Sequence, residues 1–119
     1  MSRLSKEERA ELEKRLQDDD NDIERDIQER GLTAPRITQA SLDGKIASEQ
    51  YHQFPGTTVT VCCLLLANGY TVIGESASVS PENFDAGIGR KVARAHARDK
   101  IWPLEGYLLR ERLHQKEQA

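Results

Sequence analysis

The sequence predicts an α+β fold, in which a β-hairpin-based antiparallel sheet is packed by helices and preceded by an N-terminal helical arm. Asn68-Gly69 separates two apolar, β-rich runs, and this dipeptide between such runs is the strongest short-range signal for a hairpin. Ser80-Pro81 precedes a segment in which apolar residues have helical spacing, as expected at a helix start. The first 35 residues are polar and carry only a narrow apolar stripe.

The N-terminal arm is predicted to be helical from about residue 5 to residue 30. Its apolar residues recur at spacings of four, seven and four, which places them on one side of a helix: Leu12, Leu16, Ile23 and Ile27. So narrow a stripe is typical of a helix that packs on a partner chain, although a solvated arm fits the same pattern. Gly31 and Pro35 end the helix. We therefore expect an arm and linker at residues 1–35 and a compact α+β domain at residues 36–119.

The arm also carries acidic residues at the offsets of a calcium-binding loop: Asp18, Asp20, Asp22, Asp26 and Glu29. Ile23 occupies the position at which such a loop needs glycine for its sharp turn. We therefore interpret these residues as a solvated helix face, or as a contact for a basic partner, and expect no metal there.

A second helix is predicted from Thr38 to Gln53. Thr38 is a suitable N-cap, and Leu42, Ile46 and Tyr51 form an apolar side. Gly44 weakens this prediction, because glycine in a helix costs about 1 kcal/mol relative to alanine. Pro55-Gly56 ends the segment with a turn.

The hairpin is expected to close through a two-residue type I′ turn at Asn68-Gly69. That turn would pair Leu65 with Val72 and Leu64 with Ile73. The first strand is apolar on both faces, so both need cover. Because two strands cannot provide it alone, we expect helices on one or both faces, and a partner chain is a further source of strands.

The segment after Ser80-Pro81 is predicted to form a helix whose apolar side comprises Phe84, Ile88, Val92, Ala95 and Trp102. Pro103 breaks or restarts this helix. Leu104 and Leu108 then form the inner side of a last helix. Gly87 and Gly89, near the helix start, permit close approach of a ligand or, as we expect, of a strand.

The candidate binding residues are a basic stripe and two aromatic residues. Arg90, Arg94 and Arg98 recur every four residues beside Lys91, and arginine forks match phosphate oxygens. The alternative is an exposed helix face whose arginines form ion pairs within the helix or between subunits, with the acidic N-terminal arm as one candidate partner. Tyr70 or Trp102 could stack on a base, although the leucines near Trp102 favour a core position for it.

Composition argues against several classes of function. The net charge of −3 does not suit a wholesale binder of nucleic acid or membrane. No apolar run is long enough to span a bilayer, and the adjacent Cys62 and Cys63 cannot bridge each other in a regular strand. The three histidines lack metal spacing, and no nucleophile lies beside a base. We expect no cofactor and no enzymatic activity, and we rank a hydrolase built around Glu75 lowest.

Four separated blocks resemble a family of small tailed-bacteriophage proteins, named after gene product 49 of one enterobacterial phage and gene 66 of another. The blocks are residues 54–62, 68–76, 80–85 and 101–109, and the resemblance extends from about Ile37 to Leu113. It implies a phage accessory protein in the bacterial host cytoplasm and transfers no residue role. By analogy with other small phage proteins, we expect a homo-oligomer that counters host defence. It would sequester a nucleotide immune signal or occlude a host defence protein; the alternative is a nucleic-acid-binding accessory protein.

Overall fold

The computed structural model describes residues 6–32 and 34–118, and the chain divides into two units after residue 35. The first unit contains α1 (Lys6–Glu29), which confirms the predicted helix. The backbone N–H groups of Gly31 and Leu32 donate to the carbonyls of Gln28 and Ile27, each at 3.1 Å. With a φ of 67° at Gly31, this is the Schellman arrangement that ends a helix.

The helical stripe of the arm is described only in part. Ile23 is 59% exposed, Ile27 is half-buried, and the side chains of Leu12 and Leu16 lie outside the described part. Residues 18–29, which have the offsets of a calcium loop, are helical throughout. They therefore do not form the bent loop that calcium coordination would need.

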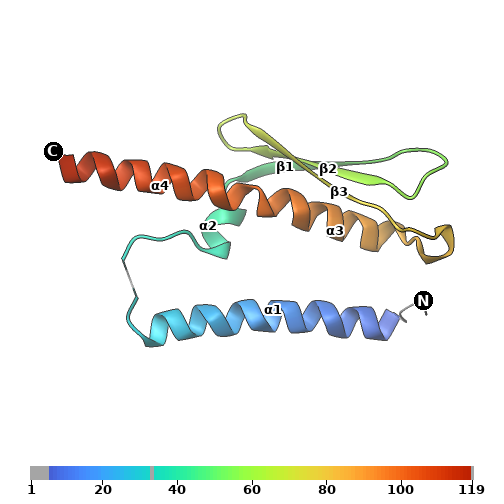
Figure 1. Cartoon of the computed structure of the whole chain (residues 1–119), viewed down its shortest axis with the longest axis horizontal. Coiled ribbons are helices and arrows are strands. Elements are labelled where there is room, and N and C mark those ends of the chain that lie inside the picture. Colours follow the sequence, from blue (N-terminus) through green and yellow to red (C-terminus); the bar gives the residue numbers. More distant parts are fainter. Residues whose placement is uncertain (1–5, 33, 119) are drawn as a thin grey trace. The chain divides into compact units, whose positions relative to one another are not determined.

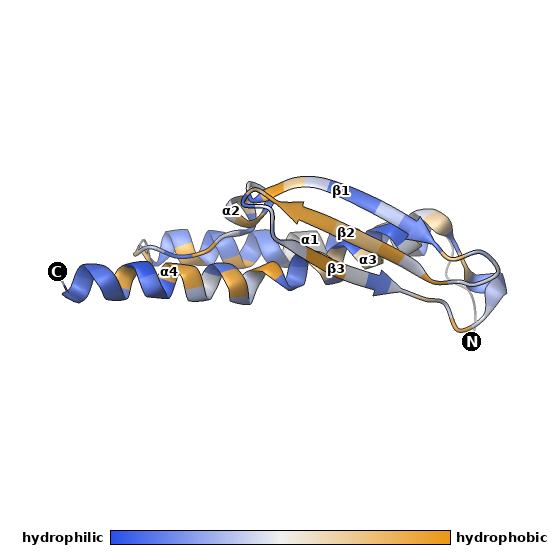
Figure 2. Ribbon diagram, turned by 90° about the horizontal axis from the view of Figure 1, so that it is seen from above, coloured by the Kyte–Doolittle hydropathy of each residue, from blue (hydrophilic) through white to orange (hydrophobic). Residues whose placement is uncertain are grey.

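The second unit is built on a three-stranded antiparallel sheet of β1 (Ile46–Gln53), β2 (Thr60–Leu66) and β3 (Thr71–Ser76), in that order. Helices pack against it, so the predicted α+β class is confirmed (Figure 1). Figure 2 shows β2 as a largely apolar strand beside the more polar β1. The central position of β2 explains this difference, because only a central strand has neighbours on both edges.

The hairpin at Asn68-Gly69 is present, but the predicted type I′ turn and its register are wrong. Leu64 pairs with Val72 and Cys63 with Ile73, one residue away from the expected register. A type I′ turn needs a positive φ at both of its central residues. Gly69 has a φ of 91°, but Asn68 does not have a positive φ, because no described residue other than glycine has one. The N–H of Leu66 donates to the carbonyl of Tyr70 at 2.8 Å, and that of Gly69 to Leu66 at 2.9 Å. This is a three-residue loop, and the shift places Ile73 on the exposed face.

The predicted helix from Thr38 to Gln53 is wrong beyond its first turns. Only α2 (Gln39–Asp43) is helical, capped by Thr38, whose Oγ1 accepts from the N–H of Ser41 at 3.0 Å. Gly44 follows as the C-cap, and the next residues form β1. Pairing with the apolar β2 therefore outweighs the weak helical pattern of this polar segment.

The helix predicted at Ser80-Pro81 begins later than expected. Residues Pro81–Asn83 form a single 3₁₀ turn, η1, and α3 (Ala86–Asp99) is capped by Asp85, whose Oδ1 accepts from the N–H of Ile88 at 3.0 Å. After α3, α4 (Ile101–Gln118) continues beyond the sheet (Figure 1). Pro103 cannot donate to the carbonyl of Asp99, which explains the interruption at Lys100.

The side of α3 that faces the sheet is formed by small residues instead of the predicted large ones. Ala93, Ala97 and Ile101 are completely buried, whereas Val92 is 38% exposed. A Cβ atom built on Gly74 of β3 would lie 2.2 Å from the carbonyl oxygen of Ala93 and from the nitrogen of Ala97. The backbone of α3 therefore rests directly on β3.

Gly89 confirms the close helix-to-strand packing that the sequence predicted. A Cβ atom there would lie 2.9 Å from Oγ1 of Thr60, on β2. Gly87 does not contribute to this packing, since a Cβ atom there would meet only the cap residue Asp85 within 4 Å.

The opposite face of the sheet carries no helix of the second unit. Cross-strand pairing places three side chains of β2 on this open face: Val61, Cys63 and Leu65. Leu65 is 39% exposed and Ile73, beside Cys63 on β3, is 51% exposed. The expectation that helices cover one or both faces is therefore met on one face, and the open face retains an apolar centre.

Candidate functional site

The candidate site is the basic stripe on α3, here called the arginine row: Arg90, Lys91, Arg94 and Arg98. The three arginines lie on successive turns of one helix and therefore on one side of it. Arg90 and Lys91 are exposed, whereas Arg94 and Arg98 are half-buried. The difference arises from tertiary contacts of the last two with β1 and α2.

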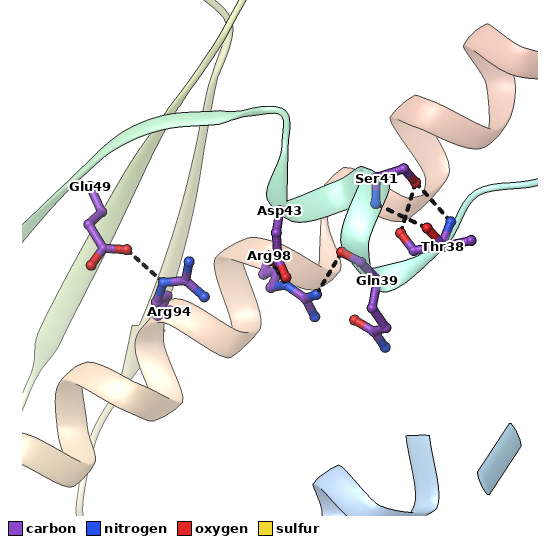
Figure 3. Close-up of polar contacts among 7 residues, drawn as sticks. All are labelled: Thr38, Gln39, Ser41, Asp43, Glu49, Arg94 and Arg98. Carbon is purple, nitrogen blue, oxygen red and sulfur yellow. Dashed lines mark hydrogen bonds and ion pairs between the residues drawn. The ribbon is translucent and has the colours of Figure 1, made fainter. Parts of the chain in front are cut away.

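Arg94 forms an ion pair with the sheet. Its Nε donates to Oε2 of Glu49, on β1, at 2.6 Å (Figure 3). The side chains of Arg94 and Glu49 are 36% and 42% exposed. This hydrogen bond is the main reason that the pKa of Arg94 is raised, so the guanidinium is firmly protonated.

Glu49 belongs to a short polar chain below β1. The Tyr51 side chain lies on the same face of the sheet as Glu49, and Tyr51 is directly opposite Cys62 in the strand pairing. Burial, followed by the charges of Cys62 and Glu49, raises the pKa of Tyr51 to about 12. Burial also raises the pKa of the Cys62 thiol. Tyr51 and Cys62 are therefore neutral at physiological pH, and Glu49 carries the negative charge that faces Arg94.

Arg98 connects α3 to α2. Its Nε donates to Oδ1 of Asp43 at 2.7 Å and its Nη2 to the carbonyl of Gln39 at 3.2 Å (Figure 3). The Arg98 side chain is only 18% exposed, and that of Asp43 is 53% exposed. The contact closes the last turn of α2 onto α3, which is a structural role.

Both ion pairs use Nε, which leaves other N–H donors of each guanidinium outside the contact with its carboxylate. In Figure 3 the remaining nitrogens of Arg94 point away from Glu49. Each carboxylate therefore orients a guanidinium without occupying all of its donors. Such a pre-oriented fork suits an anion with several oxygen acceptors.

The two aromatic candidates lie in different parts of the fold. Trp102 is half-buried and packs against the hydrophobic core, as its leucine neighbours predicted. Tyr70 is 57% exposed at the hairpin tip, where it lines a groove with Lys45 and Tyr107. Tyr70 is the more exposed of the two, and the groove that it lines includes none of the arginines of the row.

Sequence reasoning missed Glu49 and Asp43, the two carboxylates that hold the row. No local pattern marks them, because Glu49 faces α3 only when its segment is a strand. Arg94 and Arg98 do form ion pairs, but with β1 and α2 of the same chain, and not within the helix or with the N-terminal arm as the alternative interpretation expected.

A cavity of about 540 Å³ lies at the start of α3 and is lined by part of the predicted apolar side, Phe84, Ile88 and Val92. Glu75 also lines it, and His96 contacts the main-chain oxygen of Glu75 at 2.7 Å through Nδ1. The histidine therefore does not bond to the carboxylate.

The described residues contain neither a metal-binding cluster nor a membrane-spanning helix. No three of their histidine, cysteine, aspartate and glutamate side chains are placed to hold a metal ion. None of their helices is both long enough and apolar enough to cross a membrane.

Comparison with known proteins gives one match. The sequence model of a family described as Phage protein (N4 Gp49/phage Sf6 gene 66) matches residues 37–113, which confirms the resemblance found in the sequence. Neither the curated proteins nor the solved structures contain a match to the chain. The matched range contains the sheet, α2, α3 and most of α4, and it excludes α1.

Proposed function

The chain belongs to the phage protein family of N4 Gp49 and phage Sf6 gene 66, and from that premise we propose that it is an accessory protein that counters host defence by binding. In this proposal it acts in the host cytoplasm, without catalysis, and sequesters a nucleotide immune signal. The observation that supports the proposal is the arginine row, in which Glu49 and Asp43 each hold one guanidinium through Nε.

The spacing of the row suits a ligand with more than one phosphate oxygen to offer. Side chains four residues apart on a helix have Cβ atoms about 5–6 Å apart, so one phosphate or diphosphate can reach two neighbouring arginines. Holding the guanidinium groups in place before binding lowers the entropy cost of ordering them. Arg94 is the central residue of the row and has the larger exposure of the two paired arginines.

The charge of the row favours a small nucleotide over a long nucleic acid. The row has four cationic side chains, and Glu49 and Asp43 neutralise the charges of Arg94 and Arg98. A phosphate group carries about −1.5 to −2 charges, so a row of this size suits one or two phosphate groups. Nucleic-acid binding draws its affinity from many neutralised phosphates, and this row offers few; that alternative is therefore second.

The test begins with native mass spectrometry of protein purified from bacteria, followed by mass analysis of the compounds that denaturation releases. We expect an intact nucleotide at a fixed ratio to subunits. Its affinity should fall by about 10- to 100-fold in Arg94→Gln, because charge-assisted hydrogen bonds are lost. Hydrolysed products would instead indicate an enzyme.

Arg110→Gln is the matched control, because Arg110 is an exposed arginine on α4 that pairs with Glu117 at 2.9 Å. It should bind the released nucleotide like the wild type. If Arg94→Gln folds and also binds like the wild type, the arginine row is not the ligand site. A protein that carries no nucleotide and takes up none would contradict sequestration altogether.

A second candidate function is occlusion of a host defence protein, and the open face of the sheet favours it. An apolar centre with a polar rim, which no described helix of the second unit covers, is typical of a protein interaction site. The same face is available to a second copy of the chain in the homo-oligomer that we expect. Leu65→Glu places a charge in this centre and should abolish co-purification of a host protein from infected cells, whereas Arg94→Gln should not.

A further inference from the structure

A groove of about 350 Å³ lies between the hairpin tip and the first half of α4, apart from the arginine row. Tyr70 and Tyr107 line it together with two basic residues, Lys45 and Arg112. Its apolar lining includes leucines of β2 and α4: Leu66, Leu104 and Leu108. The volume is within the range of about 300–1,000 Å³ that is usual for small-molecule sites.

The aromatic side chains of the groove are unusually exposed. Tyr107 is 75% exposed and Tyr70 57% exposed, and Leu104 and Leu108, beside them, are 40% and 39% exposed. Packing a flat ligand ring against an aromatic side chain stabilises the complex, because it buries apolar surface and allows the two rings to stack. Two exposed tyrosines in one groove thus offer stacking surface that the described fold leaves unused.

The basic side chains of the groove differ from the arginines of α3. Among the described residues, the side chains of Lys45 and Arg112 form no hydrogen bond or ion pair. Arg94, Arg98 and Arg110, by contrast, each pair with a carboxylate. With Lys45 and Arg112 as cations and Glu105 as a carboxylate, the lining has a net charge of +1, which suits an anion such as a phosphate monoester.

The backbone holds the walls of the groove in place. The N–H of Ala67 donates to the carbonyl of Lys45 at 2.8 Å, which fastens the hairpin tip to the start of β1. Oδ1 of Asn68 accepts from the N–H of Tyr70 at 3.0 Å and fixes the turn beside the tyrosine. The backbone at Lys45 and Tyr70 is therefore fixed by hydrogen bonds, and a ligand has only their side chains to order.

We propose that this groove is a second binding site, for a flat aromatic ring that carries a phosphate, the chemistry of a nucleoside monophosphate. The ring lies against the tyrosines and the leucines, and the phosphate lies between Lys45 and Arg112. Glu105, which also lines the groove, is an acceptor for amino or hydroxyl groups of the ligand. The site does not depend on the arginine row and holds whether or not that row binds a ligand.

The test is a titration of the full chain with AMP, in which calorimetry measures the affinity and NMR amide chemical shifts locate the site. Adenosine and ribose 5-phosphate supply the two halves of the ligand, and inorganic phosphate supplies the anion alone. We expect AMP to bind more tightly than either half, with shifts at residues 66–70 and 104–112. Tyr107→Ala should lower the affinity for AMP by at least about fivefold, since stacking of a base on an aromatic residue contributes about 1–3 kcal/mol.

Lys45→Gln combined with Arg112→Gln should remove the advantage of AMP over adenosine. Tyr107 and Arg112 are exposed, so these variants are expected to fold. Lys116→Gln, on the same helix but outside the groove, is the matched control and should bind AMP like the wild type. Absence of AMP binding, or binding that Arg94→Gln abolishes while Tyr107→Ala does not, would overturn the proposal.

Discussion

Replacing Gly74 by alanine tests the closest contact in the fold, where the backbone of α3 lies on β3. The added Cβ atom would lie 2.2 Å from the carbonyl oxygen of Ala93, 2.2 Å from the nitrogen of Ala97 and 2.8 Å from the Cα of Ala97. All three are backbone atoms, so no side chain can rotate away. The helix itself has to move.

The size of that movement sets the expected cost. Non-bonded heavy atoms approach to about 3.5 Å without repulsion, so α3 must retreat from β3 by about 1 Å. Overpacking typically costs about 1–3 kcal/mol. Because α3 also brings Ala93 and Ala97 into the core, its retreat opens gaps around Leu64 and Cys62. We therefore expect a loss of about 3 kcal/mol or more.

Thermal and denaturant unfolding, followed by circular dichroism, measure this loss. For a domain of about 60–100 residues each kcal/mol lowers Tm by about 4–8 °C, so Gly74→Ala should lower it by more than about 10 °C. Gly106→Ala is the matched control, since a Cβ atom on that α4 glycine meets nothing within 4 Å. It should raise stability by about 0.5–1 kcal/mol through helix propensity. Equal stability of Gly74→Ala and the wild type would refute the described packing.

Substitutions at three further positions test the hairpin turn, the helix cap and the polar chain below β1. Gly69→Ala should cost about 1–2 kcal/mol, because Gly69 has a φ of 91° that disfavours a Cβ atom although the space is open; chemical denaturation measures the cost. Asp85→Ala should cost about 1 kcal/mol and Asp85→Asn much less, since both Asp and Asn cap helices. The pKa of Tyr51 is about 12 in the folded protein and about 10.0 in the unfolded chain. The protonated hydroxyl therefore stabilises the fold fully below about pH 10, and this stabilisation is lost as the pH rises toward about 12. Unfolding between about pH 9 and pH 11.5 should therefore show a smaller loss of stability in Tyr51→Phe than in the wild type, and equal losses would contradict the assigned burial.

The sequence predicts the position of the hairpin better than its register. Asn68-Gly69 marks the turn correctly, since glycine is needed for a positive φ in either kind of loop. The number of loop residues is decided instead by which side chains of β3 face α3. The observed register directs Val72 and Gly74 toward the helix, and only Gly74 permits its close approach. Gly74 acts by having no side chain, so the hydrophobic pattern of the sequence does not reveal its role.

The same reason explains the wrong apolar side of α3. The hydrophobic pattern predicts that Ile88 and Val92 face the core, whereas close contact with a strand backbone requires small residues. Gly89, Ala93 and Ala97 have the spacing of one helix side, and this pattern of small residues is a signal that could have identified the packed side. The predicted side lies partly along the cavity at the start of α3.

β1 could not be predicted from its own residues, and the candidate site depends on it. Its segment is polar and resembles a weak helix, so its strand conformation comes from pairing with β2. The pairing places Glu49 and Tyr51 on the face toward α3, where Glu49 meets Arg94. The sequence alone therefore shows a row of arginines and not the carboxylates that orient them.

The arrangement of these carboxylates bears on the kind of ligand that the arginine row can select. Glu49 and Asp43 are about half exposed and lie at the edge of the row, so an anion that binds the arginines comes close to both. Repulsion by the carboxylates lowers the affinity of the row for every anion. Only a ligand that makes additional contacts compensates for this loss of affinity. A bare phosphate lacks such contacts, whereas a nucleotide provides a ring and hydroxyl groups. The ion pairs thus favour discrimination against inorganic phosphate, which a protein that sequesters a scarce nucleotide would require.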